Sequence, residues 1–140
     1  MDKVRWGLLS TARINRRLIP PIRASKRSEL AAVASREQER AQAYAVEWEI
    51  PRVFGSYEEL LAADEIDAVY ISLPNHLHAE WTVRALRAGK HVLCEKPFAI
   101  SVEEVDRMIA ASHETGRVLQ EAFMYRHHPQ TKLAEAWIKD

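Results

Sequence analysis

Short runs of apolar residues alternate with longer amphipathic segments along the whole chain. The apolar runs predict strands at residues 4–9, 30–34, 52–54, 68–73, 91–94 and 118–123. Between them, apolar side chains recur every three or four positions, the spacing of a helix with one buried face. This spacing predicts helices over residues 12–27, 37–49, 56–63, 76–88, 101–115 and 129–140.

Several predicted helices carry signals for their ends. Ser56 and Ser101 are each followed three residues later by Glu, the pattern of a capping box. Gly89 is placed to stop the helix before it. Pro20-Pro21 should break or kink the first helix, because proline removes a backbone donor and clashes with the preceding turn.

The alternation of strands and helices predicts an α/β fold with a doubly wound, mostly parallel sheet of six strands, a Rossmann fold. Because the strands are continuously apolar, we expect helices on both faces of the sheet. Ligands bind at the carboxyl ends of the strands in this architecture. Candidate chemistry is therefore expected at residues 10–15, 35–36, 73–78, 95–97 and 121–128.

Composition narrows the class of protein. The 140 residues include 20 basic and 20 acidic side chains, and the net charge of zero argues against a general nucleic-acid binder. No apolar run approaches the roughly 20 residues of a membrane span, and the first residues lack a secretory signal. Cys94 is the only cysteine, so disulfides within the chain and thiolate zinc cages are excluded. We expect a cytoplasmic protein with neither nucleic-acid nor membrane partners.

The charge is unevenly distributed. Residues 3–28 contain eight basic side chains and no acidic one. Two interpretations stay open, since these residues can form an ordinary solvated helix surface or a local positive field for a phosphorylated ligand.

The turn after the first strand, Ser10-Thr11-Ala12-Arg13-Ile14-Asn15, stands where dinucleotide-binding proteins usually carry G-x-G-x-x-G. None of the three glycine positions holds glycine. Ser and Ala are nevertheless small enough to let backbone N–H groups reach a pyrophosphate, and the Ser10 and Thr11 hydroxyls could donate to it. A plain strand-to-helix turn fits these residues equally well.

The second strand ends in Ser35-Arg36. NAD-binding proteins place an acid there for the ribose 2′-hydroxyl, whereas NADP-binding proteins have an arginine nearby. Arg36 offers a planar fork for a 2′-phosphate, with Ser35 as a second donor. The pair favours NADP over NAD, and a solvated arginine is the alternative.

Further segments carry a family resemblance. They are Ser-Leu-Pro-Asn-His-Leu-His at 72–78, Cys-Glu-Lys-Pro at 94–97 and Glu-Ala-Phe-Met-Tyr-Arg-His-His-Pro at 121–129. With residues 6–14 and 34–36 they resemble the Gfo/Idh/MocA family of glucose-fructose oxidoreductases and inositol dehydrogenases. Within it, the match is closest to the branch of NADP-dependent aldose and dihydrodiol dehydrogenases. The resemblance implies a Rossmann domain at residues 1–124 and the start of a second domain at 125–140.

The resemblance also implies roles for single residues. Lys96 would be the catalytic residue, beside the nicotinamide and the substrate hydroxyl. Glu95 would orient it, and Pro97, cis in the family, would aim it inward. The implied cofactor-binding set is Ser10, Thr11, Ala12, Arg13, Ile14, Ser35, Arg36, Leu73, Pro74, Asn75, His78, Glu95, Lys96, Pro97 and Arg126. No metal site is expected, because His76 and His78 lack a third ligand at useful spacing.

The implied activity is that of an NADP-dependent oxidoreductase acting on the CH–OH groups of a sugar, polyol or cyclic diol. Family members are considerably longer, and their second domain binds substrate and carries a catalytic histidine. We therefore expect the 140-residue chain to bind cofactor, to lack turnover and to form a homo-oligomer. Two alternatives stay open: a non-catalytic NADP-binding or oligomerising module, and a two-domain dehydrogenase acting on an amino-acid precursor.

Overall fold

The computed structural model describes residues 3–139, which form one parallel sheet with helices around it. The strands are β1 (Val4–Leu9), β2 (Ser28–Ala34), β3 (Arg52–Phe54), β4 (Ala68–Ile71), β5 (His91–Cys94) and β6 (Leu119–Glu121). They lie in the order β3-β2-β1-β4-β5-β6, and every neighbouring pair is parallel. This is the doubly wound order with its switch point between β1 and β4. The predicted Rossmann fold is confirmed.

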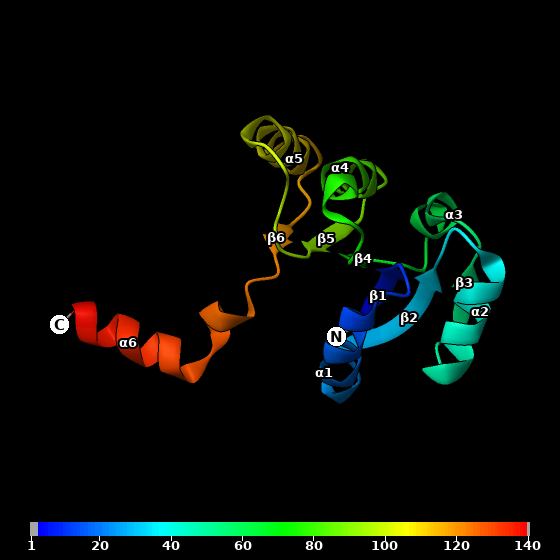
Figure 1. Ribbon diagram of the computed structural model, residues 1–140, viewed down its shortest axis with the longest axis horizontal. Coiled ribbons are helices and arrows are strands. Elements are labelled where there is room, and N and C mark those ends of the chain that lie inside the picture. Colours follow the sequence, from blue (N-terminus) through cyan, green and yellow to red (C-terminus); the bar gives the residue numbers. More distant parts are fainter. Residues whose placement is uncertain (1–2, 140) are drawn as a thin grey trace.

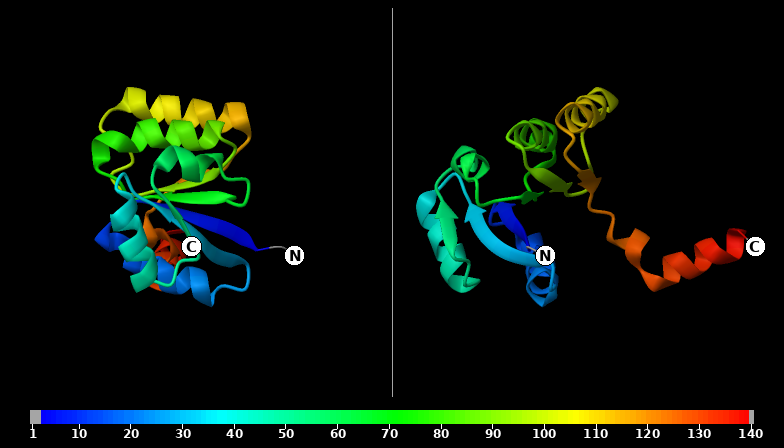
Figure 2. Two further views of the ribbon diagram at one scale, coloured as in Figure 1. Left: turned by 90° about the vertical axis from the view of Figure 1, so that its right-hand side faces the viewer. Right: turned by 180° about the vertical axis from the view of Figure 1, so that it is seen from behind.

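Helices pack on both sides of the central strands (Figure 1, Figure 2). They are α1 (Ile19–Ala24), α2 (Gln38–Glu47), α3 (Tyr57–Ala62), α4 (His78–Arg87), α5 (Val102–Thr115) and α6 (Pro129–Lys139). Short 3-10 turns precede three of them: η1 (Arg13–Arg17), η2 (Asn75–Leu77) and η3 (Met124–His127). None of the described helices combines the length and apolarity that a membrane crossing requires.

Alternating side chains divide the interior into two apolar cores. Leu9 and Ile71 point to the face that α3, α4 and α5 cover, whereas Leu8 and Tyr70 point to the face of α1 and α2. Neighbouring residues of a strand face opposite sides of the sheet, so a continuously apolar strand contributes to both cores. This packing explains why the central strands lack a polar face.

The second face is covered incompletely. Beside β5 and β6, opposite α4 and α5, lies an open apolar hollow of about 560 Å³, whose lining includes Trp6, Tyr70, Leu93 and Phe123. Helix α6 extends away from the sheet (Figure 2) and buries none of its residues. The expectation that helices cover both faces is wrong for this part of the sheet, because α5 returns on the side of α4 and no described helix lies opposite.

Helix ends follow the sequence signals with one difference. Ser56 and Ser101 accept hydrogen bonds from the N–H groups of Glu59 and Glu104, so both capping boxes are confirmed. The helix predicted over residues 12–27 instead divides at residue 18 into η1 and α1. Pro20-Pro21 lie in the first turn of α1, where a backbone N–H would have no partner within the helix. The predicted break is therefore confirmed just before the prolines, and the prolines themselves lie in the first turn of the second segment.

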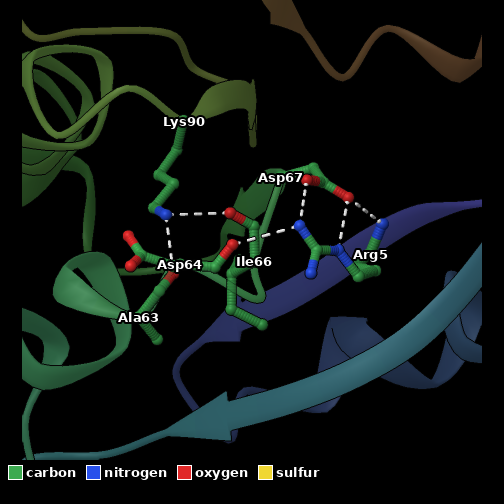
Figure 3. A network of polar contacts seen from close by, with 6 residues as sticks. All are labelled: Arg5, Ala63, Asp64, Ile66, Asp67 and Lys90. Atoms are coloured by element: carbon green, nitrogen blue, oxygen red, sulfur yellow. Dashed lines mark hydrogen bonds and ion pairs between the residues drawn. The ribbon is translucent and has the colours of Figure 1, made fainter.

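Two positively charged side chains connect separate segments at the amino-terminal edge of the sheet (Figure 3). Arg5 on β1 donates to the carboxylate of Asp67 from Nε at 2.9 Å and from Nη2 at 2.6 Å. Lys90, which is buried, donates from its ammonium to the carbonyl oxygens of Ala63 at 2.7 Å and Ile66 at 2.8 Å. These bonds join β1 to the segments that enter β4 and β5, at the edge opposite the carboxyl ends of the strands.

Because of the Asp67 carboxylate, the stability of this edge of the sheet depends on pH. Hydrogen bonds from Arg5 lower the pKa of Asp67 from 3.8 to about 2. Because the folded pKa lies below the unfolded one, the stabilisation is present above pH 3.8 and is lost as the pH falls toward 2. We expect Asp67→Asn to lower the free energy of unfolding by about 1 kcal/mol at neutral pH, and by progressively less in acid, as urea unfolding at a series of pH values would measure.

A matched control removes a carboxylate from an exposed pair. Glu135 accepts from Lys139 at 2.6 Å on the surface of α6, so Glu135→Gln should change the stability less. If the loss of unfolding free energy in Asp67→Asn stayed constant as the pH fell, the ion pair with Arg5 could not be its cause.

Candidate functional site

The carboxyl ends of β1, β2 and β4 border a cleft of about 200 Å³ at the switch point of the sheet. Seven residues that the sequence analysis proposed for binding meet in its lining: Ser10, Thr11, Ala12, Ser35, Arg36, Leu73 and Pro74. The other lining residues are Glu37, Arg40, Tyr57, Ser72 and Leu77. The cleft is therefore where the candidate chemistry concentrates.

Ser10 has the backbone conformation of a glycine. Its φ of 121° lies in a region that L residues rarely adopt, and such strain costs about 1–3 kcal/mol. The side chain offsets part of this cost, because its Oγ lies 2.8 Å from Ser72 Oγ and accepts from the Ala12 N–H at 3.1 Å. A tight turn after β1 is thus formed without glycine.

Asn15 closes this turn into a ring of hydrogen bonds. The side chain is fully buried; its Nδ2 donates to the Ser10 carbonyl at 2.8 Å, and its Oδ1 accepts from Ser72 Oγ at 2.6 Å. Ser72 Oγ in turn accepts from Ser10 Oγ, so the ring joins the end of β1 to the end of β4. The Ser10 proton is engaged in this ring, which leaves Thr11 as the hydroxyl in the turn that can donate into the cleft.

Two arginines lie beside the buried Tyr57 at the far end of the cleft. Arg36 follows β2, and Arg40 stands four residues later in α2; both side chains are exposed. Burial raises the pKa of Tyr57, while the positive charges of Arg36 and Arg40 oppose that rise. The Tyr57 ring is fixed edge-on against Trp81, with 4.9 Å between centroids. Paired guanidinium groups beside a fixed phenol suit a doubly charged phosphate.

At the end of β5, Glu95 holds the backbone of the residue that follows it. Glu95 is buried; its Oε1 accepts from the Tyr70 hydroxyl, and its Oε2 accepts from the Lys96 N–H at 3.1 Å. Burial and the adjacent Glu95 carboxylate raise the pKa of Tyr70, so this phenol stays protonated and remains a donor. The Lys96 side chain is exposed, and the peptide bond between Lys96 and Pro97 is cis, as the resemblance implied.

His78 lies behind the cleft rather than in its lining. The residue is 1% exposed. Its Nε2 lies 2.8 Å from the Leu73 carbonyl oxygen, and its Nδ1 lies 2.8 Å from the Pro97 carbonyl oxygen. The ring therefore connects the loop after β4 with the loop after β5, and both of its nitrogens are engaged by backbone.

The remaining candidates surround the cleft without lining it. Arg13 and Ile14 border a separate hollow with Arg16 and Arg17. The exposed residues among them are Arg13 on η1, Asn75 on η2, Lys96 and Pro97 after β5, and Arg126 on η3. The structure thus brings the turn and arginine candidates together and arranges the others at the neighbouring strand ends.

The sequence analysis assigned no role to five residues of this region: Asn15, Arg40, Tyr57, Tyr70 and Ser72. Arg40 carries a usable signal, because it stands four residues after Arg36, near the spacing that puts two side chains on one side of a helix. The partners of Asn15 and Tyr70 are distant in sequence, and no local pattern identifies them.

The donor set of the cleft fits a dinucleotide that carries a phosphate on its adenosine ribose. Small residues after β1 leave room for a ligand beside the backbone of the turn, and two arginines against the single acid Glu37 make the lining positive. Ser35 is buried, with its Oγ accepting from the Glu37 N–H at 3.4 Å. Among residues 3–139 no group of three metal-binding side chains comes together.

Comparison with known proteins finds relatives over nearly the whole chain. The model of the Gfo/Idh/MocA family, described as an oxidoreductase family with an NAD-binding Rossmann fold, matches residues 4–123. An uncharacterized oxidoreductase of Rhizobium meliloti is 53% identical over 131 residues, which are 93% of this chain and 39% of that protein. D-xylose 1-dehydrogenase (NADP(+)) 2 of Haloferax volcanii is 50% identical over 130 residues, 92% of this chain and 40% of the relative.

A solved structure shows the same arrangement. The 3-ketoreductase of Actinomadura kijaniata in complex with NADP and TDP-benzene superposes with a TM-score of 0.91 at 39% identity. The match covers 99% of this chain and 42% of the ketoreductase. This chain therefore spans about 40% of the length of the relatives that it matches.

Proposed function

The chain belongs to the Gfo/Idh/MocA oxidoreductase family, and we propose that it is the cofactor-binding part of an NADP-dependent oxidoreductase of sugars, polyols or cyclic diols. The observation that carries this proposal is the cleft at the switch point, where a glycine-free turn and a pair of arginines face one another. The names of the Haloferax dehydrogenase and the Actinomadura ketoreductase support NADP and a sugar-like substrate class.

Recognition of NADP divides between the two ends of the cleft. The Thr11 N–H and hydroxyl are the proposed donors to the diphosphate, because the Ala12 N–H already donates to Ser10 Oγ and the ring around Asn15 holds this turn in a strained form. Arg36 and Arg40 are the proposed partners of the 2′-phosphate, with Tyr57 packed beside them. An NAD-type carboxylate is missing at the end of β2, where Ser35 stands instead.

Lys96 is the proposed catalytic residue. The nicotinamide, when bound, supplies or accepts the hydride at the substrate carbon. Glu95 fixes the Lys96 backbone, and the exposed side chain can reach a hydroxyl at the carboxyl edge of the sheet. In the oxidative direction Lys96 takes up or relays the hydroxyl proton as the carbonyl forms; in the reductive direction it returns that proton.

We also propose that the cofactor domain ends near residue 124 and that this chain associates with a second copy of itself. Helix α6 leaves the sheet with Leu133, Trp137 and Ile138 exposed by 52%, 73% and 85%. The apolar hollow beside β5 and β6 adds to this uncovered surface. Contiguous exposed apolar surface of such extent usually marks a contact.

Cofactor preference provides the first test of the function. Arg36→Ala and Arg40→Ala should each weaken NADPH binding roughly tenfold or more, since each removes a charge-assisted bond to phosphate. Binding of NADH should change little, and fluorescence titration with both cofactors measures the ratio. Arg16→Ala, an exposed arginine outside the cleft, is the matched control. An unchanged ratio of NADPH to NADH affinity would show that the arginines do not read the 2′-phosphate.

Turnover provides the second test. The 140-residue chain should bind NADPH without oxidising or reducing any aldose or diol, because positioning by further residues supplies much of the rate. In a protein that joins this domain to the remaining length of its relatives, Lys96→Met should lower turnover by about 10²–10⁴ and leave cofactor affinity nearly unchanged. Lys26→Met is the surface control. Loss of cofactor affinity with intact turnover at saturation would make Lys96 a binding residue.

Association is tested by light scattering over a range of concentrations. We expect the chain to form dimers or larger assemblies, and a Trp137→Glu and Ile138→Glu double variant to dissociate more readily, because it places charges on the apolar stripe. The control Lys132→Glu changes the charge of α6 on the face opposite the stripe. A monomer at high concentration before any substitution would refute the proposal.

A further inference from the structure

We propose that His78 is a buried, positively charged clamp, with a proton on each ring nitrogen, that positions the loop of Lys96 relative to the cleft. The identity of that loop as the catalytic one rests on the proposed function. The charge state of the ring and its two bonds stand on the geometry of this chain alone.

The geometry around the ring requires two donors. Nδ1 lies 2.8 Å from the Pro97 carbonyl oxygen, and Nε2 lies 2.8 Å from the Leu73 carbonyl oxygen. Carbonyl oxygens only accept, whereas a neutral imidazole has one donor and one acceptor nitrogen. A neutral ring would therefore set a nitrogen lone pair against a carbonyl oxygen. His78 is 1% exposed, so water has no room to relieve that contact. An imidazolium forms both bonds.

The two carbonyls belong to the two loops that matter for the proposed chemistry. Leu73 lines the cleft at the end of β4. Pro97 directly follows Lys96, whose own N–H is held by the Glu95 carboxylate at 3.1 Å. The backbone of Lys96 is thus fixed on its amino side by Glu95 and on its carboxyl side, through Pro97, by His78. The ring sets the distance between the cleft wall and the lysine.

A buried cation in this place must overcome an opposing field. His78 is the first residue of α4, where the positive end of the helix dipole disfavours a cation. Two charge-assisted bonds, each roughly twice as strong as a neutral one, act against that field. The buried Lys90 ammonium likewise donates to two carbonyl oxygens, at 2.7 Å and 2.8 Å, with the carboxylates of Asp64 and Asp67 near it.

The direct test observes the protons on the ring. The chain has six histidines, and in the ¹⁵N-labelled protein the His78 signals are those that a His78→Asn variant lacks. At neutral pH we expect both His78 nitrogens to carry a slowly exchanging proton and to have similar ¹⁵N chemical shifts. If His78→Asn does not fold, through-bond correlation from the assigned backbone identifies the ring instead. One protonated and one bare nitrogen would overturn the proposal.

The second test separates a clamp from a merely structural side chain. In His78→Asn, amide hydrogen exchange should accelerate roughly tenfold or more in residues 73–77 and 95–99, because at least one carbonyl loses its donor. Exchange in β1 and β2 should stay unchanged. His76→Asn, at an exposed histidine of η2, is the matched control and should alter neither region. Unchanged exchange rates in both loops, or faster exchange spread evenly over the sheet, would refute the positioning role.

Cofactor titration distinguishes this inference from the proposed function. NADPH should bind His78→Asn several-fold more weakly than His76→Asn, since one loop forms the cleft wall. If the unsubstituted chain does not bind NADPH at all, the proposed function fails, while the ring spectrum and the loop exchange still decide whether His78 is a charged clamp.

Discussion

The hydrogen-bonded ring of Ser10, Asn15 and Ser72 is the constraint on which the site depends. Parallel strands place the ends of β1 and β4 side by side, but the turn after β1 must open for backbone N–H groups to face a ligand. Glycine usually permits such a turn at little cost. Here Ser10 adopts a φ of 121°, and the buried side chain of Asn15 together with Ser72 holds it there. Without the ring, the strained backbone would relax and the cleft would lose its first wall.

Side chains with nitrogen donors connect separate segments at both edges of the sheet, with different consequences. At the amino edge, Lys90 and the pair of Arg5 with Asp67 join segments that enter three strands, and their effect is on stability. At the carboxyl edge, His78 joins two loops that leave the strands, and its effect is on geometry near Lys96. Lys90 and His78 both bond to backbone carbonyls, whereas Arg5 bonds mainly to the Asp67 carboxylate. Such bonds hold main chain in place without occupying the side chains that face the cleft.

The sequence predicted the fold because the spacing of the apolar residues, the helix caps and the composition of the strands all indicate it. It predicted Arg36 and the Glu95 to Pro97 segment because both stand directly at strand ends. Asn15 was missed, since its partner Ser72 is 57 residues away and only the sheet order brings them together. Pro20-Pro21 were predicted to break or kink a helix, and the helix divides just before them, because proline is tolerated in the first turn and not in the interior. The uncovered face beside β5 and β6 was also missed, since periodicity shows that a strand is apolar but not which segment covers it.

The cleft at the carboxyl edge is complete within the described residues, whereas the hollow on the face of β5 and β6 is open. The cleft is walled by residues of this chain, which hold one another by short hydrogen bonds, so a cofactor meets a preorganised surface. Glu95 and Tyr70 belong to the lining of the open, mainly apolar hollow, and the Glu95 carboxylate accepts from the Tyr70 hydroxyl. An ion pair or hydrogen bond strengthens when water is excluded from it. The bonds that fix Lys96 would therefore tighten when a further surface covers the hollow, and binding of that surface would couple directly to the position of the lysine.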